Sequence, residues 1–232
     1  MIIVIAKFAA VVLLGYLLGS IPFGVIISRR MAKVDVRQHG SGKIGMTNVL
    51  RTAGRKAALA VVVLDLLKGA LAVTFAGLIV GADYLVVGNI GFGRLVAQCL
   101  AALAAIAGHI WPVFLKFRGG RGVATFFGGL VALCPIAALF GGEVFVIGTG
   151  LSKFVSLGSI AAVASTYGVL IPLTIVYGFP IEYLIYALIG AVVILVTHRS
   201  NIARLLKGRE RRLGEKAQPL SADPESKDSQ GH

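Results

Sequence analysis

The sequence predicts an all-α protein: a polytopic, integral membrane helical bundle of about seven transmembrane helices. Of its 232 residues, 57% are hydrophobic and only 14% are charged, whereas a soluble domain has about 45–50% apolar and about 25% charged residues. Apolar runs long enough to cross a bilayer recur along the chain. Nineteen of its 23 Lys and Arg residues gather in three segments between those runs. This composition excludes an ordinary soluble globule and a disordered chain.

Five apolar runs each satisfy the requirement of about 20 residues for a membrane-spanning helix. They cover residues 2–28, 57–80, 95–115, 159–177 and 181–197. The stretch 123–154 is different, because it is too long for one span, short for two, and interrupted by several glycines and Pro135. Its contribution has to be decided from the topology.

The three basic segments predict the orientation of the chain. The positive-inside rule places residues 29–56, 116–121 and the region after His198 in the cytoplasm, with the N-terminus outside and the C-terminus cytoplasmic. The chain must then cross an even number of times after residue 121. The stretch 123–154 therefore forms two short helices, giving the seven spans that we favour, or a re-entrant or interfacial segment, giving five.

The chain is predicted to contain one domain and a tail. Residues 1–213 would form a single integral membrane domain. The remainder, residues 214–232, is polar and is predicted to be a disordered C-terminal tail. Cys99 and Cys134 both lie in apolar runs without neighbours at metal-ligand spacing, so neither a disulfide nor a metal site is predicted.

The segment from His39 to Gly54 combines glycines, small polar side chains and positive charge. Three glycines would let the backbone curl so that successive N–H groups face one point, a nest that binds anions. These glycines are Gly40, Gly42 and Gly45, and the accompanying polar side chains are Ser41, Lys43, Thr47, Asn48 and Arg51. The segment could therefore cradle a phosphate. It could equally be a flexible basic loop on anionic headgroups.

Two later segments carry similar chemistry. The Arg118-Gly119-Gly120-Arg121 sequence precedes a predicted helix, whose N-terminus favours anions, although it could also act only as a positive-inside anchor. His198 and Asn201 would share one face of a helix at the membrane exit, where an amphipathic interfacial helix is the simpler alternative. Asp65 and Lys68 lie inside the second span at a spacing that permits pairing, or the lysine could snorkel to the interface.

Four sequence segments together resemble the bacterial acyl-phosphate:glycerol-3-phosphate acyltransferase family. Ser41–Gly54 is similar to its GSGNxGATNxxRxxG signature, and GHIWPVFLKFRGGRGVAT is similar to GHxFPxFxxFKGGKGVAT. HRSNIARLLKGRE and GSIPFG resemble two further family segments, and all four occur in the family order between residues 19 and 210. The departures are Lys43 for Asn, Met46 for Ala, and Arg118 and Arg121 for two lysines, where arginine keeps the charge but presents a bidentate fork.

The resemblance implies a reaction. An acyl group would move from acyl phosphate to the 1-hydroxyl of glycerol 3-phosphate, giving lysophosphatidic acid and phosphate, the first acylation of bacterial phospholipid synthesis. It implies an active site on the cytoplasmic face of the bacterial inner membrane, contact with membrane lipid, and no cofactor, metal or nucleic acid.

The resemblance also implies which residues take part. The expected catalytic residues are Ser41, Arg51, His198 and Asn201. The expected substrate-binding residues are Gly40, Gly42, Gly45, Thr47, Asn48, Arg118, Gly119, Gly120, Arg121, Ser156 and Glu210. The proton acceptor could be His198 or a phosphate oxygen of the substrate itself.

Two other functions fit parts of the same pattern. A transporter of phosphate or of a small phosphoester would share the apolar spans and basic loops, but transporters often contain inverted repeats and mid-membrane sites. This sequence has no repeat evident by eye, and its polar motifs gather on one predicted face. A lipid-binding scaffold without chemistry would tolerate loss of Ser41 or Arg51. The enzyme is the favoured interpretation.

Overall fold

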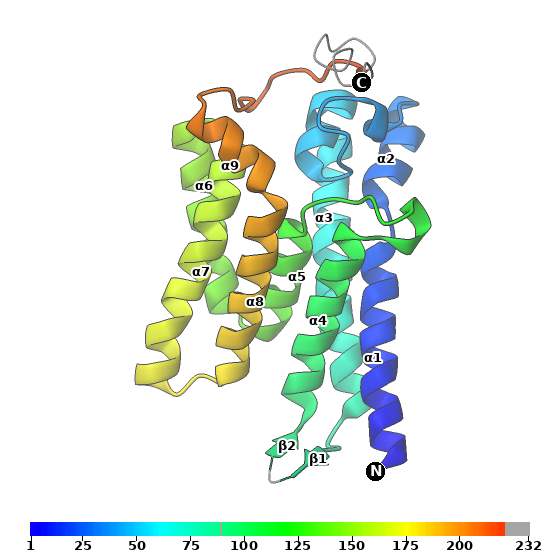
Figure 1. The fold of residues 1–232 in the computed structure, drawn as a ribbon, viewed down its shortest axis with the longest axis vertical. Helices are drawn as coiled ribbons and strands as arrows, with labels where there is room; N and C mark the ends of the chain where they lie inside the picture. Colours follow the sequence, from blue (N-terminus) through cyan, green and yellow to red (C-terminus); the bar gives the residue numbers. More distant parts are fainter. Residues whose placement is uncertain (89, 221–232) are drawn as a thin grey trace, which may run out of the picture.

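The computed structural model describes residues 1–88 and 90–220, which form a helical bundle with residues 1 and 220 at opposite ends (Figure 1). Nine α-helices account for most of this part of the chain. They are α1 (Ile2–Ser20), α2 (Phe23–Ala32), α3 (Met46–Val80), α4 (Arg94–Ile110), α5 (Val123–Leu133), α6 (Pro135–Ser152), α7 (Val155–Tyr177), α8 (Ile181–Thr197) and α9 (Arg199–Leu206). Short 3-10 helices follow α2 (Val36–Gln38) and α4 (Val113–Leu115).

The predicted integral membrane architecture is confirmed. In the described part of the chain, five helices are long and apolar enough to cross a membrane, namely Ile2–Ala32, Met46–Val80, Arg94–Leu115, Pro135–Ser152 and Val155–Tyr177. A sixth is obtained when Ile181–Thr197 and Arg199–Leu206, which meet at a 60° bend, are taken together. The favoured number of seven spans and the sidedness of the termini stay predictions.

The stretch 123–154, which the sequence left open, folds as two helices joined at Cys134. Pro135 begins α6, where its missing N–H costs no hydrogen bond. The preceding helix, α5, has only 11 residues, which span about 16 Å at 1.5 Å per residue. It packs closely on α3, because a Cβ on Gly128 would lie 1.9 Å from the Leu66 carbonyl oxygen. Glycine allows helix backbones to approach in this way within a membrane.

Two helices differ from the predicted spans. The first span is broken at Ile21 and Pro22, which separate α1 from α2. The first basic loop is shorter than expected, since α3 already begins at Met46 and bends at Gly54, whose φ of 85° is in the left-handed region. Arg51 therefore sits on a rigid helical turn rather than on a loop.

A short hairpin joins α3 to α4 at the end of the bundle that holds the N-terminus (Figure 1). Its strands, β1 (Leu85–Val87) and β2 (Ile90–Phe92), pair antiparallel. No strand was expected here from the sequence, because three residues are too few to show the alternation of apolar and polar side chains that is typical of a strand.

The first part of the predicted tail makes contacts, and we call residues 211–220 the C-terminal segment. The Gly40 amide donates to the Gln218 carbonyl at 2.9 Å, and the Ala217 amide donates to the Arg51 carbonyl at 3.2 Å. His39 also forms an isolated antiparallel bridge with Pro219. The remaining residues of the predicted tail, 221–232, lie outside the described residues.

Candidate functional site

A cavity of about 360 Å³ lies where α3, α5 and α7 begin. One half of it is polar and cationic, and the other half is apolar. The polar half brings together residues from all three basic segments; Arg51 and Arg211, for example, are 160 positions apart in the sequence. The three basic segments therefore lie on one face of the protein, as the sequence predicted.

Three helix N-termini meet at the polar half, and none has a side-chain cap among the described residues. Gly45, Gly122 and Phe154 occupy the N-cap positions of α3, α5 and α7 without donating or accepting a capping bond. The first residues of each helix line the cavity: Met46 and Thr47, Val123 and Ala124, and Val155 and Ser156. Uncapped N-termini offer unpaired N–H groups and partial positive charge, so their convergence favours an anion.

Full positive charges reinforce these helix ends. Arg51, Arg121 and Lys43 line the cavity, and the Nε atoms of Arg51 and Arg121 are buried without a hydrogen-bond partner among the described residues. Burial is the main cause that lowers the pKa of Arg121 to about 10; the nearby Glu210 carboxylate opposes this effect, and Arg204 and Arg51 add to it. Burial and neighbouring arginines likewise lower the pKa of Lys43. With a pKa of about 10, Arg121 stays charged at neutral pH.

Glu210 organises the opposite wall of the polar half. Its Oε1 accepts from the Ser156 hydroxyl at 3.0 Å and from Asn201 Nδ2 at 2.7 Å, while Oε2 accepts from Arg204 Nε at 2.8 Å. The Glu210 side chain is 5% exposed. The carboxylate therefore fixes three side chains around the cavity, and the Asn201 Oδ1 is left buried without a partner in the described chain.

His198 lies at the bend between α8 and α9. Its Nδ1 is 2.8 Å from the Ile194 carbonyl oxygen, which can only accept, so Nδ1 carries the proton and Nε2 presents a lone pair. Burial and the charge of Arg121 lower the pKa of His198 to about 4. The ring is therefore neutral at physiological pH and able to accept a proton.

The glycine-rich loop has a different arrangement from the predicted nest. The amides of Gly40 and Gly42 donate to the carbonyls of Gln218 and His39, and the Ser41 amide donates to Asn48 Oδ1 at 3.2 Å. These N–H groups are thus already paired within the protein. Neither Gly40 nor Gly42 is among the cavity-lining residues, whereas Ser41 and Gly45 are. The uncapped N-terminus nearest to this loop at the polar half is instead that of α3.

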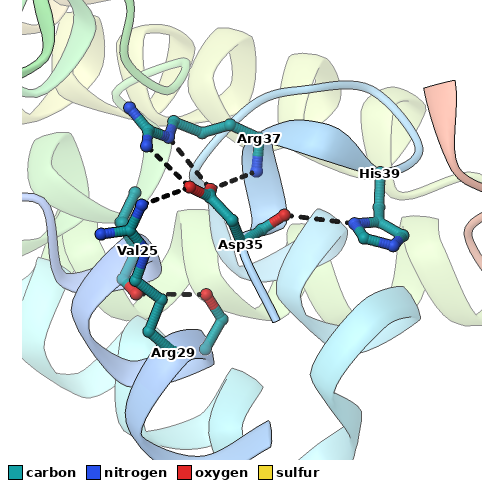
Figure 2. A network of polar contacts seen from close by, with 6 residues as sticks. Val25, Arg29, Asp35, Arg37 and His39 are labelled. Carbon is teal, nitrogen blue, oxygen red and sulfur yellow. Dashed lines mark hydrogen bonds and ion pairs between the residues drawn. The ribbon is translucent and has the colours of Figure 1, made fainter. Parts of the chain in front are cut away.

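Asn48 holds this loop together. Its Nδ2 lies 2.9–3.0 Å from the carbonyl oxygens of Val36, His39 and Lys43 and shares its two hydrogens among these three acceptors. Figure 2 shows the second support, in which Asp35 accepts from Arg29 and from Arg37. These bonds, led by those from Arg37, hold the pKa of Asp35 well below its usual range. The loop that carries Ser41 is therefore rigidly anchored on both sides.

Replacing Asn48 by Asp is expected to disrupt the loop, because a carboxylate cannot donate to three carbonyl oxygens. Each lost buried hydrogen bond costs about 1–3 kcal/mol, so the protein should melt at a clearly lower temperature and lose most of its activity. Gln38→Glu is the matched control, since Gln38 is exposed in the same loop. Equal melting temperatures for the two variants in detergent would contradict this role of Asn48.

Three residues of the second basic segment do not reach the cavity. Arg118 is exposed, and Gly119 and Gly120 donate their amides to the carbonyls of Ile110 and His109. Of the Arg118–Arg121 sequence, Arg121 alone is among the cavity-lining residues. The two glycines instead permit close packing on the end of α4.

The apolar half of the cavity lies between α3, α5 and α6. Its lining residues are Val62, Leu66, Phe127, Val131, Ala138, Gly142, Phe145 and Val146. Val131 and Val146 are also more than half exposed. The cavity therefore continues from the cationic end toward the outer surface of the bundle, and its apolar walls suit a hydrocarbon chain.

Several lining residues were not singled out for the site from the sequence: Arg204, Arg211, Ser159, Asp65 and His109. Arg204 follows Asn201 by three positions, a helical spacing that could have indicated it. Asp65 and Lys68 were recognised as an intramembrane pair, but nothing in the sequence linked them to His109. No group of three or more His, Cys, Asp or Glu side chains suited to a metal occurs in residues 1–88 and 90–220.

Comparison with known proteins identifies the family. The family model described as "Glycerol-3-phosphate acyltransferase" matches residues 9–208. "Glycerol-3-phosphate acyltransferase 3" of Dehalococcoides mccartyi (strain CBDB1) is 63% identical over 213 residues, covering 92% of this chain and 99% of that protein. The glycerol-3-phosphate acyltransferase of Halalkalibacterium halodurans is 42% identical over 201 residues, covering 87% of this chain and 93% of that protein.

Two solved structures share the fold. The crystal structure of PlsY (YgiH), described as an integral membrane glycerol 3-phosphate acyltransferase in its glycerol 3-phosphate form, matches with a TM-score of 0.77 and 38% identity, covering 89% of this chain and 96% of that chain. Its lysophosphatidic acid form matches with a TM-score of 0.76 and 38% identity, covering 89% and 95%. These findings favour the enzyme over the transporter, and the chain belongs to the glycerol-3-phosphate acyltransferase family.

Proposed function

We propose that the protein transfers a fatty acyl group from acyl phosphate to the 1-hydroxyl of glycerol 3-phosphate, releasing lysophosphatidic acid and inorganic phosphate. The observation that carries this proposal is the cavity itself, which joins three uncapped helix N-termini and buried cations to an apolar slot. Both substrates have phosphate groups, and the donor has in addition a long apolar chain. One cavity with these two halves accommodates both.

The donor would lie with its acyl chain between α3, α5 and α6. Its phosphate would then face Arg121 and the start of α5. An acyl phosphate is a mixed anhydride, so the phosphate leaves once its growing negative charge is stabilised. Arg121, whose Nε has no partner among the described residues, supplies a charge-assisted hydrogen bond to that leaving group.

Glycerol 3-phosphate would occupy the wall formed by α7 and α9. Arg51, Thr47 and the start of α3 hold its phosphate, with Ser41 alongside. Ser156 and Asn201, both fixed by Glu210, orient the glycerol so that the 1-hydroxyl oxygen faces the acyl carbonyl carbon. Such orientation contributes much of the rate, because it replaces a bimolecular encounter by a positioned one.

The bond changes balance with a single proton transfer. The 1-hydroxyl oxygen forms a bond to the acyl carbon, the bond from that carbon to the phosphate oxygen breaks, and phosphate departs with the electron pair. The hydroxyl proton goes to Nε2 of His198, the unprotonated nitrogen of a neutral ring, or to a phosphate oxygen. We further propose that this cationic end faces the cytoplasm at the bacterial inner membrane, as the positive-inside rule predicts.

The test is an assay of the purified protein in detergent or nanodiscs with labelled glycerol 3-phosphate. Parallel reactions contain acyl phosphate or the corresponding acyl-CoA as donor. We expect labelled lysophosphatidic acid from acyl phosphate, together with an equal amount of inorganic phosphate. Product formed from acyl-CoA but not from acyl phosphate would contradict the proposed donor, and folded protein without either product would contradict the proposed activity.

A further inference from the structure

Three ionisable side chains form a buried cluster in the middle of the bundle. Lys68 Nζ is 2.8 Å from Asp65 Oδ1 and 2.8 Å from His109 Nδ1, and it also donates to the Ile21 carbonyl at 3.3 Å. The side chains of Asp65, Lys68 and His109 are only 2–4% exposed. The lysine therefore does not snorkel to the interface, which the sequence had left open.

Burying such a cluster in a membrane protein costs free energy, which suggests that the cluster has a role in function. Charged groups in membrane-spanning helices lose their hydration, and the pair Asp65–Lys68 recovers only part of that energy. The proposed reaction does not use these side chains as ligands of either phosphate. The cluster does, however, tie together the break between α1 and α2, the centre of α3 and the end of α4.

The proton on His109 can be placed from this geometry. An ammonium group can only donate, so Nδ1 of His109 accepts from Lys68 and the ring carries its proton on Nε2. That second nitrogen faces the loop that follows α4, because a Cβ on Gly120 would lie 2.0 Å from it. The ring edge of His109 thus fills the space that any side chain at position 120 would need.

The loop that rests on His109 leads directly to Arg121. The Gly120 amide donates to the His109 carbonyl at 3.0 Å, and the Thr197 hydroxyl donates to the Arg121 carbonyl at 3.2 Å. The backbone of Arg121 is therefore held between the end of α4 and the end of α8. A shift of the His109 ring would move the backbone from which the Arg121 guanidinium enters the cavity.

We propose that Asp65, Lys68 and His109 form a positioning network that sets the location of the Arg121 guanidinium, and that none of the three acts on a substrate directly. Lys68 fixes the rotamer and tautomer of His109, and the His109 ring supports Gly120 and hence Arg121. This inference rests on the proposed function, because it assigns to Arg121 the phosphate that leaves from the acyl donor.

The test measures whether the network acts through Arg121. The double variant Asp65→Asn/Lys68→Met removes both charges together, which avoids leaving one buried charge unpaired. A displacement of about 1 Å at a reacting group costs up to about 100-fold, so kcat should fall by about 10- to 100-fold. The KM for glycerol 3-phosphate should change by less than about twofold, since a different set of residues binds that substrate. Competitive inhibition by inorganic phosphate against acyl phosphate should weaken.

A second variant reaches the same loop from its other side and does not alter the buried charges. Gly120→Ala should reproduce the fall in kcat and the weaker phosphate inhibition, because its Cβ would displace the loop from His109. Gly168→Ala is the matched control, since a Cβ there meets nothing within 4 Å. Combining Asp65→Asn/Lys68→Met with Arg121→Gln should cost little more than Arg121→Gln alone, because residues that act through one another are not additive.

The outcomes separate this inference from the proposed function. Absence of turnover from acyl phosphate in the wild-type protein would contradict the proposed function. Active wild-type protein combined with normal phosphate inhibition in folded network variants, or with losses that multiply in the Arg121→Gln background, would overturn the positioning network. If Asp65→Asn/Lys68→Met fails to fold, Gly120→Ala decides the question alone by the same phosphate-inhibition measurement.

Discussion

Replacing Arg121 by alanine is expected to lower kcat/KM by about 10²–10³-fold, the effect typical of removing one preorganised donor from a transition state. The same change should leave the fold intact or make it more stable. Arg121 is buried with its Nε unpaired among the described residues, and burial, which the charge of Glu210 offsets only in part, lowers its pKa to about 10. The folded protein therefore carries an unfavourable charge that a bound anion would relieve further.

The measurement combines steady-state kinetics with thermal unfolding in detergent, and Arg118→Ala provides the contrast. Arg118 lies three positions away but is exposed and outside the cavity, so its loss should cost less than about tenfold, as expected of a screened surface charge. Similar losses in the two variants would refute the distinction between the two arginines. A large drop in melting temperature for Arg121→Ala would refute the unfavourable buried charge.

Replacing His198 by alanine is expected to lower kcat by about 10²-fold or more if its Nε2 accepts the hydroxyl proton. His198→Gln is the matched variant, because the amide can keep the bond to the Ile194 carbonyl but cannot act as a base. Both variants should be slow at every pH. Near-wild-type kcat/KM in His198→Ala would exclude the histidine base and leave the substrate phosphate as the proton acceptor.

The pH dependence gives an independent measurement of the same group. His198 has a pKa of about 4 in the folded protein, below the value of about 6.5 in an unfolded chain. The neutral base is therefore present throughout pH 5–8, and no loss of activity due to His198 should appear near pH 6.5. Between pH 6.5 and about 4 the unfolded chain binds more protons at this site, so the stability contributed by neutral His198 decreases as the pH falls.

The features of the fold that depend on hydropathy and charge could be predicted from the sequence. Apolar length predicted the helical membrane bundle, and the parity of crossings required zero or two passages for the stretch 123–154, which contains α5 and α6. Helix ends were less predictable. The start of α3 at Met46 lies within a polar, basic segment, and tertiary contacts rather than hydropathy stabilise it there.

The sequence predicted several of the residues that line the cavity, but it did not predict the hydrogen bonds that these residues make. Ser41, Arg51, Arg121, Ser156, His198 and Asn201 all line one cavity, as expected from their motifs. The glycine-rich segment is arranged differently from the predicted nest, because Asn48 and Gln218 accept from its amides. Glycines in a sequence indicate where the backbone can adopt a tight turn. They do not indicate which acceptor will pair with the N–H groups of that turn. The three helix N-termini that replace the nest depend on packing between distant segments.

The position of the C-terminal segment has a consequence for the timing of biosynthesis. Arg51 Nη2 donates to the carbonyls of Arg211 and Arg212, and Glu210 fixes Ser156 and Asn201. Residues 210–212 leave the ribosome after all the helices that line the cavity, so they complete a site whose other walls have already been synthesised. A nascent chain halted before residue 210 should therefore be inactive, and catalysis becomes possible only once these residues have been translated.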